Sequence, residues 1–302
     1  MADQILPEQP ATPPPAEAKR PFDAPERVQI SSFFDPPPAF DFVFPGMPAG
    51  TVGAIISPGG AGKSMFALQV ATTMAGAPDA LELGLKTGKV VYLPAEDPTL
   101  AIWHRIHAMS KSWDATAKVE VTKNLHIHPL IGPEPDILSE EWFAWFEEQT
   151  KGCRVLFLDT LRRFHLLDEN SSGDMSKIIG RMEAIAWKHG CCVIFLHHSS
   201  KSAAMGGQGD AQQASRGSSV LVDNIRWQAY MSGMSKEEAK AMKVAEGERG
   251  FYVRFGISKQ NYGRPFEERW FRRGEGGVLA PTQSPMNSGI KKVPAATKVT
   301  GW

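Results

Sequence analysis

The sequence predicts an α/β protein with a mostly parallel central sheet and antiparallel strands added at one edge. Short, almost uniformly apolar runs alternate with helix-like segments through residues 51–199, and the pattern changes to strands and turns after residue 216. Apolar strands that alternate with helices are typical of a parallel sheet covered on both faces. The 302 residues, of which 42% are hydrophobic, are enough to form a buried core.

Four apolar runs are predicted to be buried strands, because each is short and rich in β-branched residues. They are TVGAIIS (51–57), KVVYLPA (89–95), CRVLFLD (153–159) and CCVIFLH (191–197). Helical patterns lie between them at 63–75, around Ile102, Ile106 and Met109, at 140–149 and at 175–189. Right-handed crossovers bring the carboxyl ends of such strands to one edge of the sheet, where ligands of open α/β folds bind.

The segments after residue 216 are predicted to form hairpin-like, antiparallel strands. Turn residues separate SSVLVDNIRWQAYMS (218–232), GFYVRFGIS (250–258) and ERWFRRGEGGVLAP (268–281). The two ends of the chain differ from this pattern. Ten of the 23 prolines fall within the first 38 residues. We expect a flexible Pro-rich tail at 1–30, a folded domain at 31–282 and a flexible tail at 283–302.

The composition excludes several classes of protein. The 33 basic and 33 acidic residues leave no net charge, which argues against a histone-like binder and leaves any nucleic-acid contact to a local patch. Three cysteines lie in apolar runs without the spacing of metal ligands, which indicates a reducing compartment. The start of the chain lacks the order of a signal peptide, and no apolar run reaches the ~18 residues of a membrane span. We expect a cytoplasmic protein with no membrane partner.

The run AIISPGGAGKSMFALQV (54–70) leaves the first strand, passes through glycines and enters a helix. Glycines allow backbone N–H groups to point into one concavity beside the positive end of the helix dipole, which forms a phosphate cradle. In the P-loop pattern the lysine reaches the β- and γ-phosphates of ATP, and the following serine supplies a hydroxyl to Mg²⁺. The predicted nucleotide-binding residues are Ser57, Gly59, Gly60, Ala61, Gly62, Lys63 and Ser64. Ser57 departs from the pattern, which has glycine there; the alternative is a Gly-rich turn that binds nothing.

The other strand ends supply partners for such a loop. Asp159 ends VLFLDT and is predicted to be the Walker-B carboxylate that, with Ser64, holds Mg²⁺. Glu96, in YLPAEDP, is predicted to orient and deprotonate the attacking water; the alternative is a solvated loop carboxylate. His197 or His198, in FLHHSS, would lie near the γ-phosphate and report its presence, with a structural histidine as the equal alternative.

Two basic segments are candidates for contact with nucleic acid. The loop at 200–219 has four glycines and several amides, and its Lys201 and Arg216 are predicted to contact a phosphodiester backbone. An ordinary flexible loop is the alternative. Arg162 and Arg163, just beyond the Walker-B position, would contact DNA or a neighbouring subunit, or else serve as helix-capping or surface charge.

Six longer strings resemble the RepA-type helicases, a family of hexameric replicative DNA helicases encoded by broad-host-range plasmids within the RecA-like ATPase superfamily. The resemblance runs from about Phe40 to Pro281 and does not cover either end. The strings are TVGAIISPGGAGKSMFALQ, YLPAEDP, LDTLRRFH, FLHHSSK, QQASRGSSVLVDNIRW and VRFGISKQNYG.

The resemblance implies a ring of subunits, a hexamer, that binds ATP and Mg²⁺, moves on single-stranded DNA and works with other replication proteins. It assigns catalysis to Glu96, γ-phosphate sensing to His198 and an arginine finger for the neighbouring subunit's site to Arg226. Lys259 is a second candidate for that site in the neighbour, and the alternative for Arg226 is an internal salt bridge. Two other functions remain open: a RecA-like DNA-binding ATPase without unwinding activity, and a nucleotide-switched regulatory ATPase.

Overall fold

The computed structural model describes residues 27–199, 221 and 224–282. The chain separates into two compact units, Met1–Ala39 and Phe40–Trp302. In the first unit the described residues include one short 3-10 helix, η1 (Ile30–Phe34). The second unit holds the sheet, the helices that cover it and the candidate site.

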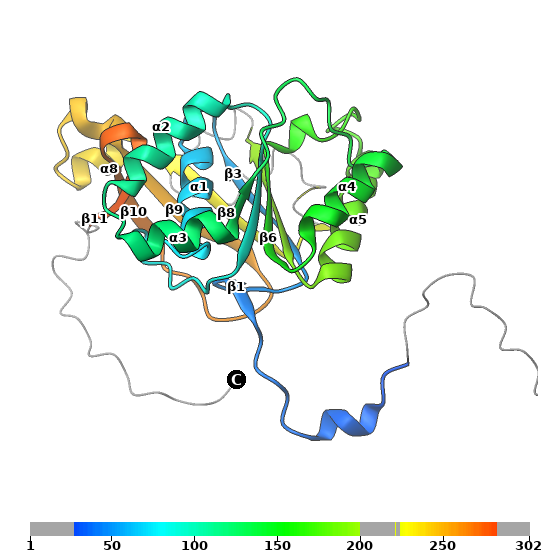
Figure 1. Ribbon diagram of the computed structural model, residues 1–302. Coiled ribbons are helices and arrows are strands. Elements are labelled where there is room, and N and C mark those ends of the chain that lie inside the picture. Colours follow the sequence, from blue (N-terminus) through cyan, green and yellow to red (C-terminus); the bar gives the residue numbers. More distant parts are fainter. Residues whose placement is uncertain (1–26, 200–220, 222–223, 283–302) are drawn as a thin grey trace, which may run out of the picture. The chain divides into compact units, whose positions relative to one another are not determined.

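Within the described residues, the second unit is built on a nine-stranded sheet in the order β11-β10-β9-β8-β3-β7-β6-β4-β5 (Figure 1). The strands from β8 to β5 in this order pair in parallel, and β9, β10 and β11 then add antiparallel. This arrangement confirms the predicted fold class. The bounds are β3 Val52–Ser57, β4 Lys89–Pro94, β5 Leu125–Ile127, β6 Cys153–Asp159, β7 Cys192–His198, β8 Trp227–Gly233, β9 Tyr252–Gln260, β10 Arg269–Arg273 and β11 Leu279–Thr282.

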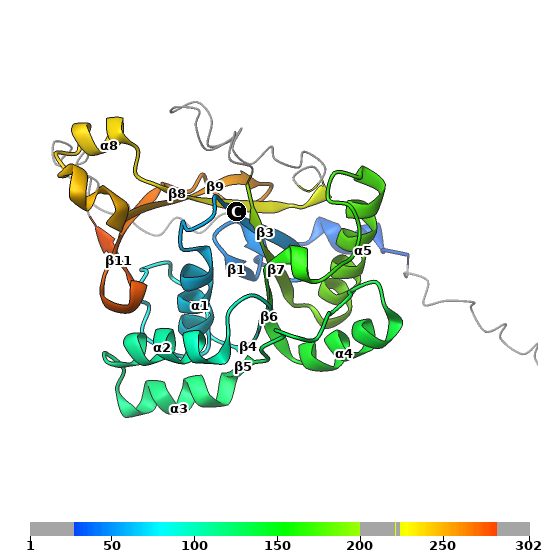
Figure 2. The same cartoon turned by 90° about the horizontal axis from the view of Figure 1, so that it is seen from above.

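Helices cover both faces of the parallel strands, as Figure 2 shows. On one face lie α1 (Lys63–Met74), α2 (Thr99–Ser110) and α3 (Ala115–Asn124), and on the other lie α4 (Glu140–Thr150) and α5 (Ser172–His189). Successive strand residues alternate between two hydrophobic clusters: Ile55 packs in the cluster with α1, and its neighbours Ala54 and Ile56 pack in the cluster with α5. Burial on both faces explains why these strands are apolar at nearly every position.

The remaining elements are short. The hairpin strands β1 (Phe42–Phe44) and β2 (Met47–Pro48) precede β3, α8 (Lys236–Ala241) and the 3-10 helix η4 (Glu246–Phe251) join β8 to β9, and the 3-10 turn η5 (Glu275–Gly277) joins β10 to β11. A further 3-10 turn, η2 (Leu161–Arg163), follows β6. Among the helices in the described ranges, none combines the length and the apolarity that a bilayer crossing requires.

The structure corrects three details of the sequence prediction. The strand β8 runs parallel to β3, with Trp227 opposite Gly53, and the antiparallel additions begin only at β9. The helix α3 and the short strand β5 were not predicted, because α3 buries only Ala117 and Val121 and so has almost no apolar period. The helix α5 begins at Ser172, three residues before the predicted start, where the side chain of Ser171 accepts a hydrogen bond from the backbone N–H of Asp174.

A buried amide fastens the antiparallel strands to the first helix. Gln69 of α1 donates from Nε2 to the carbonyl oxygen of Leu279 at 3.0 Å, and it accepts at Oε1 from the N–H of Leu279 at 2.7 Å. Both backbone groups at the start of β11 are therefore satisfied by one side chain that lies 210 residues away in the chain. The start of β11 is thereby held against the middle of α1.

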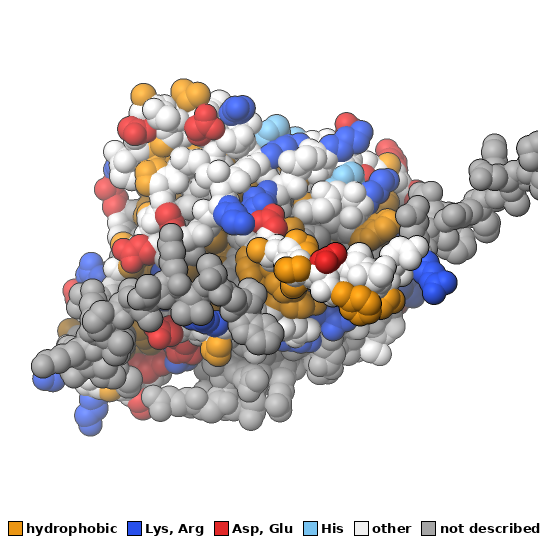
Figure 3. All heavy atoms as spheres, turned by 90° about the horizontal axis from the view of Figure 1, so that it is seen from below, with side chains coloured by type: hydrophobic (Ala, Val, Ile, Leu, Met, Phe, Trp, Pro, Cys, Tyr) orange, Lys and Arg blue, Asp and Glu red, His pale blue; other side chains and the backbone are white. Residues whose placement is uncertain are grey.

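The surface of the face seen in Figure 3 carries acidic and basic side chains that are interspersed, with hydrophobic side chains gathered between them. This mixture agrees with a chain in which 33 basic residues balance 33 acidic residues.

Candidate nucleotide-binding site

The loop between β3 and α1 has the geometry of an anion cradle. Gly60 and Gly62 have φ of 75° and 92°, in the region that favours glycine, and Gly62 is the N-cap of α1. In the described chain no side chain caps α1, so the first N–H groups of the helix remain available to a phosphate. A Cβ built at Gly59 or Gly60 would meet nothing within 4 Å, which shows that the mouth of the loop is open.

The departure at Ser57 is accommodated locally. Ser57 is buried, and its Oγ donates to the carbonyl oxygen of Pro58 at 3.0 Å. The hydroxyl is thus turned onto the loop's own backbone, and Ala61 is likewise buried in the loop. A small residue at position 57 leaves the cradle intact.

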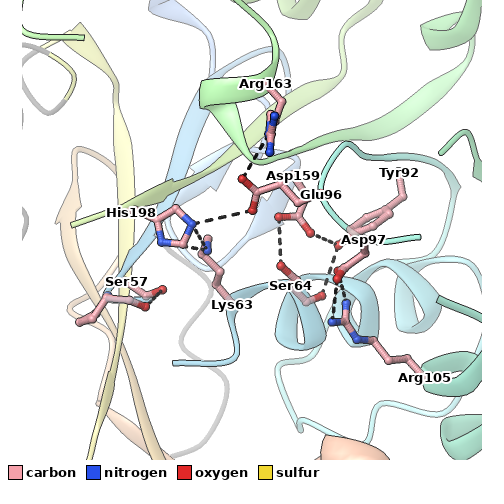
Figure 4. Close-up of polar contacts among 11 residues, drawn as sticks. Ser57, Lys63, Ser64, Tyr92, Glu96, Asp97, Arg105, Asp159, Arg163 and His198 are labelled. Carbon is pink, nitrogen blue, oxygen red and sulfur yellow. Dashed lines mark hydrogen bonds and ion pairs between the residues drawn. The ribbon is translucent and has the colours of Figure 1, made fainter. Parts of the chain in front are cut away.

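Lys63 lies at the bottom of the site beside His198 (Figure 4). Its side chain is buried, and Nζ lies 2.9 Å from Nε2 of His198. Burial lowers the pKa of Lys63, while the negative charges of Asp159, Glu96 and Asp97 oppose that shift. A buried ammonium group that faces an open anion cradle is poised to gain from a phosphate.

The two histidines that end β7 point in different directions. His198 is exposed and lies against Lys63, whereas His197 is 8% exposed and has a lowered pKa because of burial. Period-two alternation along the strand places the neighbours on opposite faces. Only His198 of this pair lies on the side of the loop.

Asp159 and Ser64 meet next to the lysine. Ser64 donates from Oγ to Oδ1 of Asp159 at 3.0 Å, and Tyr92 of β4 donates its phenolic hydrogen to Oδ2 at 2.6 Å. Burial raises the pKa of Asp159, and the two donated hydrogen bonds oppose the shift. Burial also raises the pKa of Tyr92, so the phenol keeps its proton and acts as a donor.

Glu96 lies at the mouth of the site, between two side chains. Its Oε1 is 3.5 Å from Nε of Arg163, and its Oε2 is 3.9 Å from Nε2 of His198. The adjacent carboxylate, Asp97, turns away and accepts two hydrogen bonds from the guanidinium of Arg105 on α2. The two carboxylates that follow β4 therefore have different surroundings, and only Glu96 faces the histidine beside Lys63 (Figure 4).

Comparisons with known proteins agree with this geometry. A family model described as "AAA domain" matches residues 17–204, which is more than half of the chain. This chain belongs to the AAA domain family. The match includes the β3–α1 loop, Glu96, Asp159 and His198, and it ends before β8.

Solved structures show the fold of this AAA domain. The solved structure of another protein's ATPase domain has 16% sequence identity and a TM-score of 0.52, and the match covers 77% of this chain and 85% of that chain. A structure of a DnaB-like replicative helicase and its interactions with primase has 17% identity and a TM-score of 0.53, covering 77% of this chain and 57% of that one. The chain thus spans little more than half of that helicase's length. The fold is that of the RecA-like P-loop ATPases.

The donor set of the AAA domain fits Mg²⁺. Ser64 and Asp159 offer a hydroxyl and a carboxylate oxygen 3.0 Å apart, and oxygen ligands with substrate phosphates are what this ion prefers. Within the described residues, no group of three or more His, Cys, Asp or Glu side chains is arranged to hold a metal by itself. Nucleotide phosphates would have to complete the coordination of an ion at Ser64 and Asp159.

The structure places Arg226 and Lys259 away from this site. Arg226 is exposed and directly precedes β8, whose first residue lies opposite Gly53; Lys259 of β9 lies opposite Gln228. The carboxyl end of β3 is four residues beyond Gly53, or about 13 Å along the strand. Both cations therefore lie at the end of the sheet opposite to the P-loop, on the side where β3 begins. Lys201 and Arg216 lie outside the described residues, and their predicted role stays a prediction.

Sequence reasoning missed three residues that contact the site. Tyr92 was interpreted only as part of an apolar strand, although a buried tyrosine generally needs a partner for its hydroxyl. Arg105 of α2 lies eight residues after Asp97, which precedes the helix, so no helix-face spacing indicated the pair. Arg273 of β10 donates from Nη2 to the carbonyl oxygen of Gly60 at 2.9 Å across 213 residues, and no local pattern could have indicated it.

Proposed function

We propose that this chain is a subunit of a ring-forming, ATP-dependent DNA helicase for plasmid replication, in which hydrolysis at subunit interfaces drives movement on single-stranded DNA. The proposal depends most on one observation. The candidate hydrolysis residues gather at the carboxyl ends of the parallel strands, and the candidate finger Arg226 lies at the opposite end of the sheet. An arginine at that position cannot reach the P-loop of its own chain, but it can reach the site of a neighbour in a head-to-tail ring.

Each residue of the site has a part in the proposed reaction. Lys63 and the first N–H groups of α1 bind the β- and γ-phosphates. Ser64 and Asp159 would hold Mg²⁺, which when bound neutralises charge on the phosphate oxygens. Glu96 orients the attacking water and accepts its proton on a carboxylate oxygen. His198, which contacts Lys63, would exchange that contact for one to the γ-phosphate.

Arg226 of a neighbouring subunit would complete the site. A guanidinium beside the transferring phosphoryl group stabilises the charge of the transition state and contributes a factor of ~10³ or more to the rate. Lys259, at the same end of the sheet, is the second candidate. Assembly into a hexamer, contact of Lys201 and Arg216 with single-stranded DNA, and work alongside other replication proteins complete the proposal.

Two features support the helicase over other ATPases. The fold is shared with a DnaB-like replicative helicase whose structure includes its interactions with primase. The strings from FLHHSSK to VRFGISKQNYG resemble the RepA-type plasmid helicases. The alternatives are a RecA-like DNA-binding ATPase without unwinding, and a regulatory ATPase that switches partners with its nucleotide state.

ATP hydrolysis with and without single-stranded DNA, paired with displacement of a labelled strand from a duplex, tests the proposal. A helicase shows DNA-stimulated hydrolysis and strand displacement. Stimulated hydrolysis without displacement would support the DNA-binding ATPase. Hydrolysis that is unaffected by DNA, from a protein that does not bind single strands, would support the regulatory ATPase.

A further inference from the structure

Tyr92 is a buried polar group that the proposed reaction does not use directly. It belongs to β4, next to β6, with Tyr92 opposite Phe157 and Pro94 opposite Asp159. Its ring packs in the hydrophobic cluster that includes α1, with its centroid 5.9 Å from that of Phe157, and 1% of the residue is exposed. Packing on all sides leaves the phenol with a fixed position. The hydroxyl is therefore held beside the carboxylate of Asp159.

The hydrogen bonds at Asp159 divide its two oxygens between different donors. Tyr92 donates to Oδ2 at 2.6 Å, and Ser64 donates to Oδ1 at 3.0 Å. A phenol has one hydrogen to give. The carbonyl oxygen of Ser64 is a second acceptor within reach of the Tyr92 hydroxyl, at 3.3 Å. The much shorter distance to Oδ2 directs the hydrogen to the carboxylate.

We infer that Tyr92 is a positioning residue for the divalent-cation site: its hydroxyl holds Oδ2 of Asp159, so that Oδ1 stays directed at Ser64. The inference rests on the proposed ATPase function. Without the hydroxyl, the carboxylate can rotate, and Oδ2 is left buried without a donor. Ser64 cannot supply the same restraint, because its own hydroxyl is the other expected ligand of the ion. Tyr92 instead acts from the side away from the ligand, as second partners do at other metal sites.

Tyr92→Phe removes one oxygen atom and preserves the ring, and Tyr230→Phe is its matched control. Tyr230 of β8 also donates to a carboxylate, that of Glu268, at a place remote from Asp159 in the sheet. In the full-length protein with ADP, Mn²⁺ binding followed by electron paramagnetic resonance should weaken about tenfold in Tyr92→Phe. It should stay within about twofold of the parent in Tyr230→Phe. Equal Mn²⁺ affinity in Tyr92→Phe and the parent would overturn the inference.

A double-mutant cycle with Asp159→Asn tests whether Tyr92 acts through Asp159. If it does, the loss of Mn²⁺ affinity caused by Tyr92→Phe should disappear once Asp159 is replaced. Additive losses would show that Tyr92 affects the site by another route and would also overturn the inference. A parent protein that binds neither ADP nor Mn²⁺–ADP would instead contradict the proposed function, which is a distinguishable result.

If Tyr92→Phe does not fold, the inference can still be tested on protein that retains Tyr92. The chain has four tyrosines, so 3-fluorotyrosine labelling gives four ¹⁹F signals. Phenylalanine variants of Tyr230, Tyr252 and Tyr262 assign three of them and leave the fourth to Tyr92. We expect the Tyr92 signal to shift when Mg²⁺ is added to the ADP-bound protein. A Tyr92 signal that does not move on adding Mg²⁺ would count against the inference.

Discussion

Charged side chains differ in pairing between the parallel and the antiparallel parts of the sheet. At the carboxyl ends of β3, β4, β6 and β7, Lys63 and Asp159 are buried, and burial shifts the pKa of each toward its neutral form. In the antiparallel part charged side chains pair across elements, as Arg254 of β9 does with the buried Glu238 of α8 at 2.9 Å. Lys63 and Asp159 are thus buried charges with incomplete compensation, whereas Arg254 and Glu238 form an ion pair.

The difference follows from connectivity. Parallel strands all end at the same edge, so residues far apart in the chain meet there without long side chains. Antiparallel strands end at alternate edges, and their polar residues spread over both. Uncompensated charge is what a phosphate and a divalent ion can stabilise, so we locate the proposed chemistry in the parallel part. Outside that part, Arg273 of β10 donates to the P-loop backbone, and Arg226, which precedes β8, and Lys259 of β9 are the proposed cations for a neighbouring subunit's site.

The largest effect on ATP hydrolysis is expected at Lys63, the buried cation of the parallel part. Lys63→Met should abolish ATP hydrolysis, because the cation for the β- and γ-phosphates is lost. Without nucleotide the variant should melt at the same temperature as the parent or higher, since a buried charge is replaced by an apolar chain of similar length. Lys240→Ala, an exposed lysine of α8 in the antiparallel part, is the control. Turnover at the parent rate in Lys63→Met would refute the P-loop assignment.

The effect of Lys63→Met on the melting temperature should depend on pH. The pKa of Lys63 is lower in the fold than in the unfolded chain, so the unfolded chain binds more protons between those two pKa values. The parent should therefore gain stability as pH rises through that window, toward the ordinary lysine value of about 10.4. The melting temperature of Lys63→Met lacks this contribution, so any advantage of the variant should shrink as pH rises from 7 to 10. An advantage that grew over this range would contradict the argument.

Arg226 tests whether the end of the sheet opposite to the P-loop serves another subunit. Arg226→Ala should fold, assemble and bind nucleotide and DNA, but hydrolyse ATP about 10³-fold more slowly. Mixing it with Lys63→Met subunits should restore part of the activity, because some interfaces then pair an intact P-loop with an intact finger. If activity does not return after subunit exchange has been verified, Arg226 does not act in a neighbour, and Lys259 becomes the residue to test.

Glu96 separates chemistry from binding in the parallel part. Glu96→Gln preserves size and removes the base, so nucleotide affinity should stay near that of the parent while turnover falls by ~10² or more. Glu268→Gln, a carboxylate of the antiparallel part, should leave turnover within about twofold. Loss of nucleotide binding together with an ordinary residual rate would assign Glu96 a structural role.

The smallest effect is expected at Arg273, where the two parts touch. Arg273→Ala removes the donor to the carbonyl oxygen of Gly60 and should weaken ATP binding about fivefold, with little change in turnover at saturating ATP. The control is Arg272→Ala, which removes the adjacent arginine, paired with Glu248 at the surface. Equal affinities in the two variants, measured by fluorescent-nucleotide titration, would mean that Arg273 does not support the loop.

The fold class and the edge that carries the candidate site could be predicted from the sequence, because local patterns encode them. Uniformly apolar runs indicate strands buried on both faces, and the order of strands and helices brings Glu96, Asp159 and His198 to the same edge as the glycines before Lys63. The direction of β8 could not be predicted, since an apolar run carries no sign of which way it crosses the sheet. The helix α3 was missed because it buries too little to show a period.

The contacts that support the candidate site were decided by the tertiary structure alone. Tyr92 reaches Asp159 across 67 residues and Arg273 reaches Gly60 across 213, and in each case the partner is chosen by strand order and register. Arg226 is a further case. The sequence indicates it as a candidate cation, but only the pairing of Trp227 with Gly53 shows that it lies at the end of the sheet opposite to its own P-loop. Periodicity and motif spacing are properties of neighbours along the chain. Proximity between distant strands exists only once the sheet has formed.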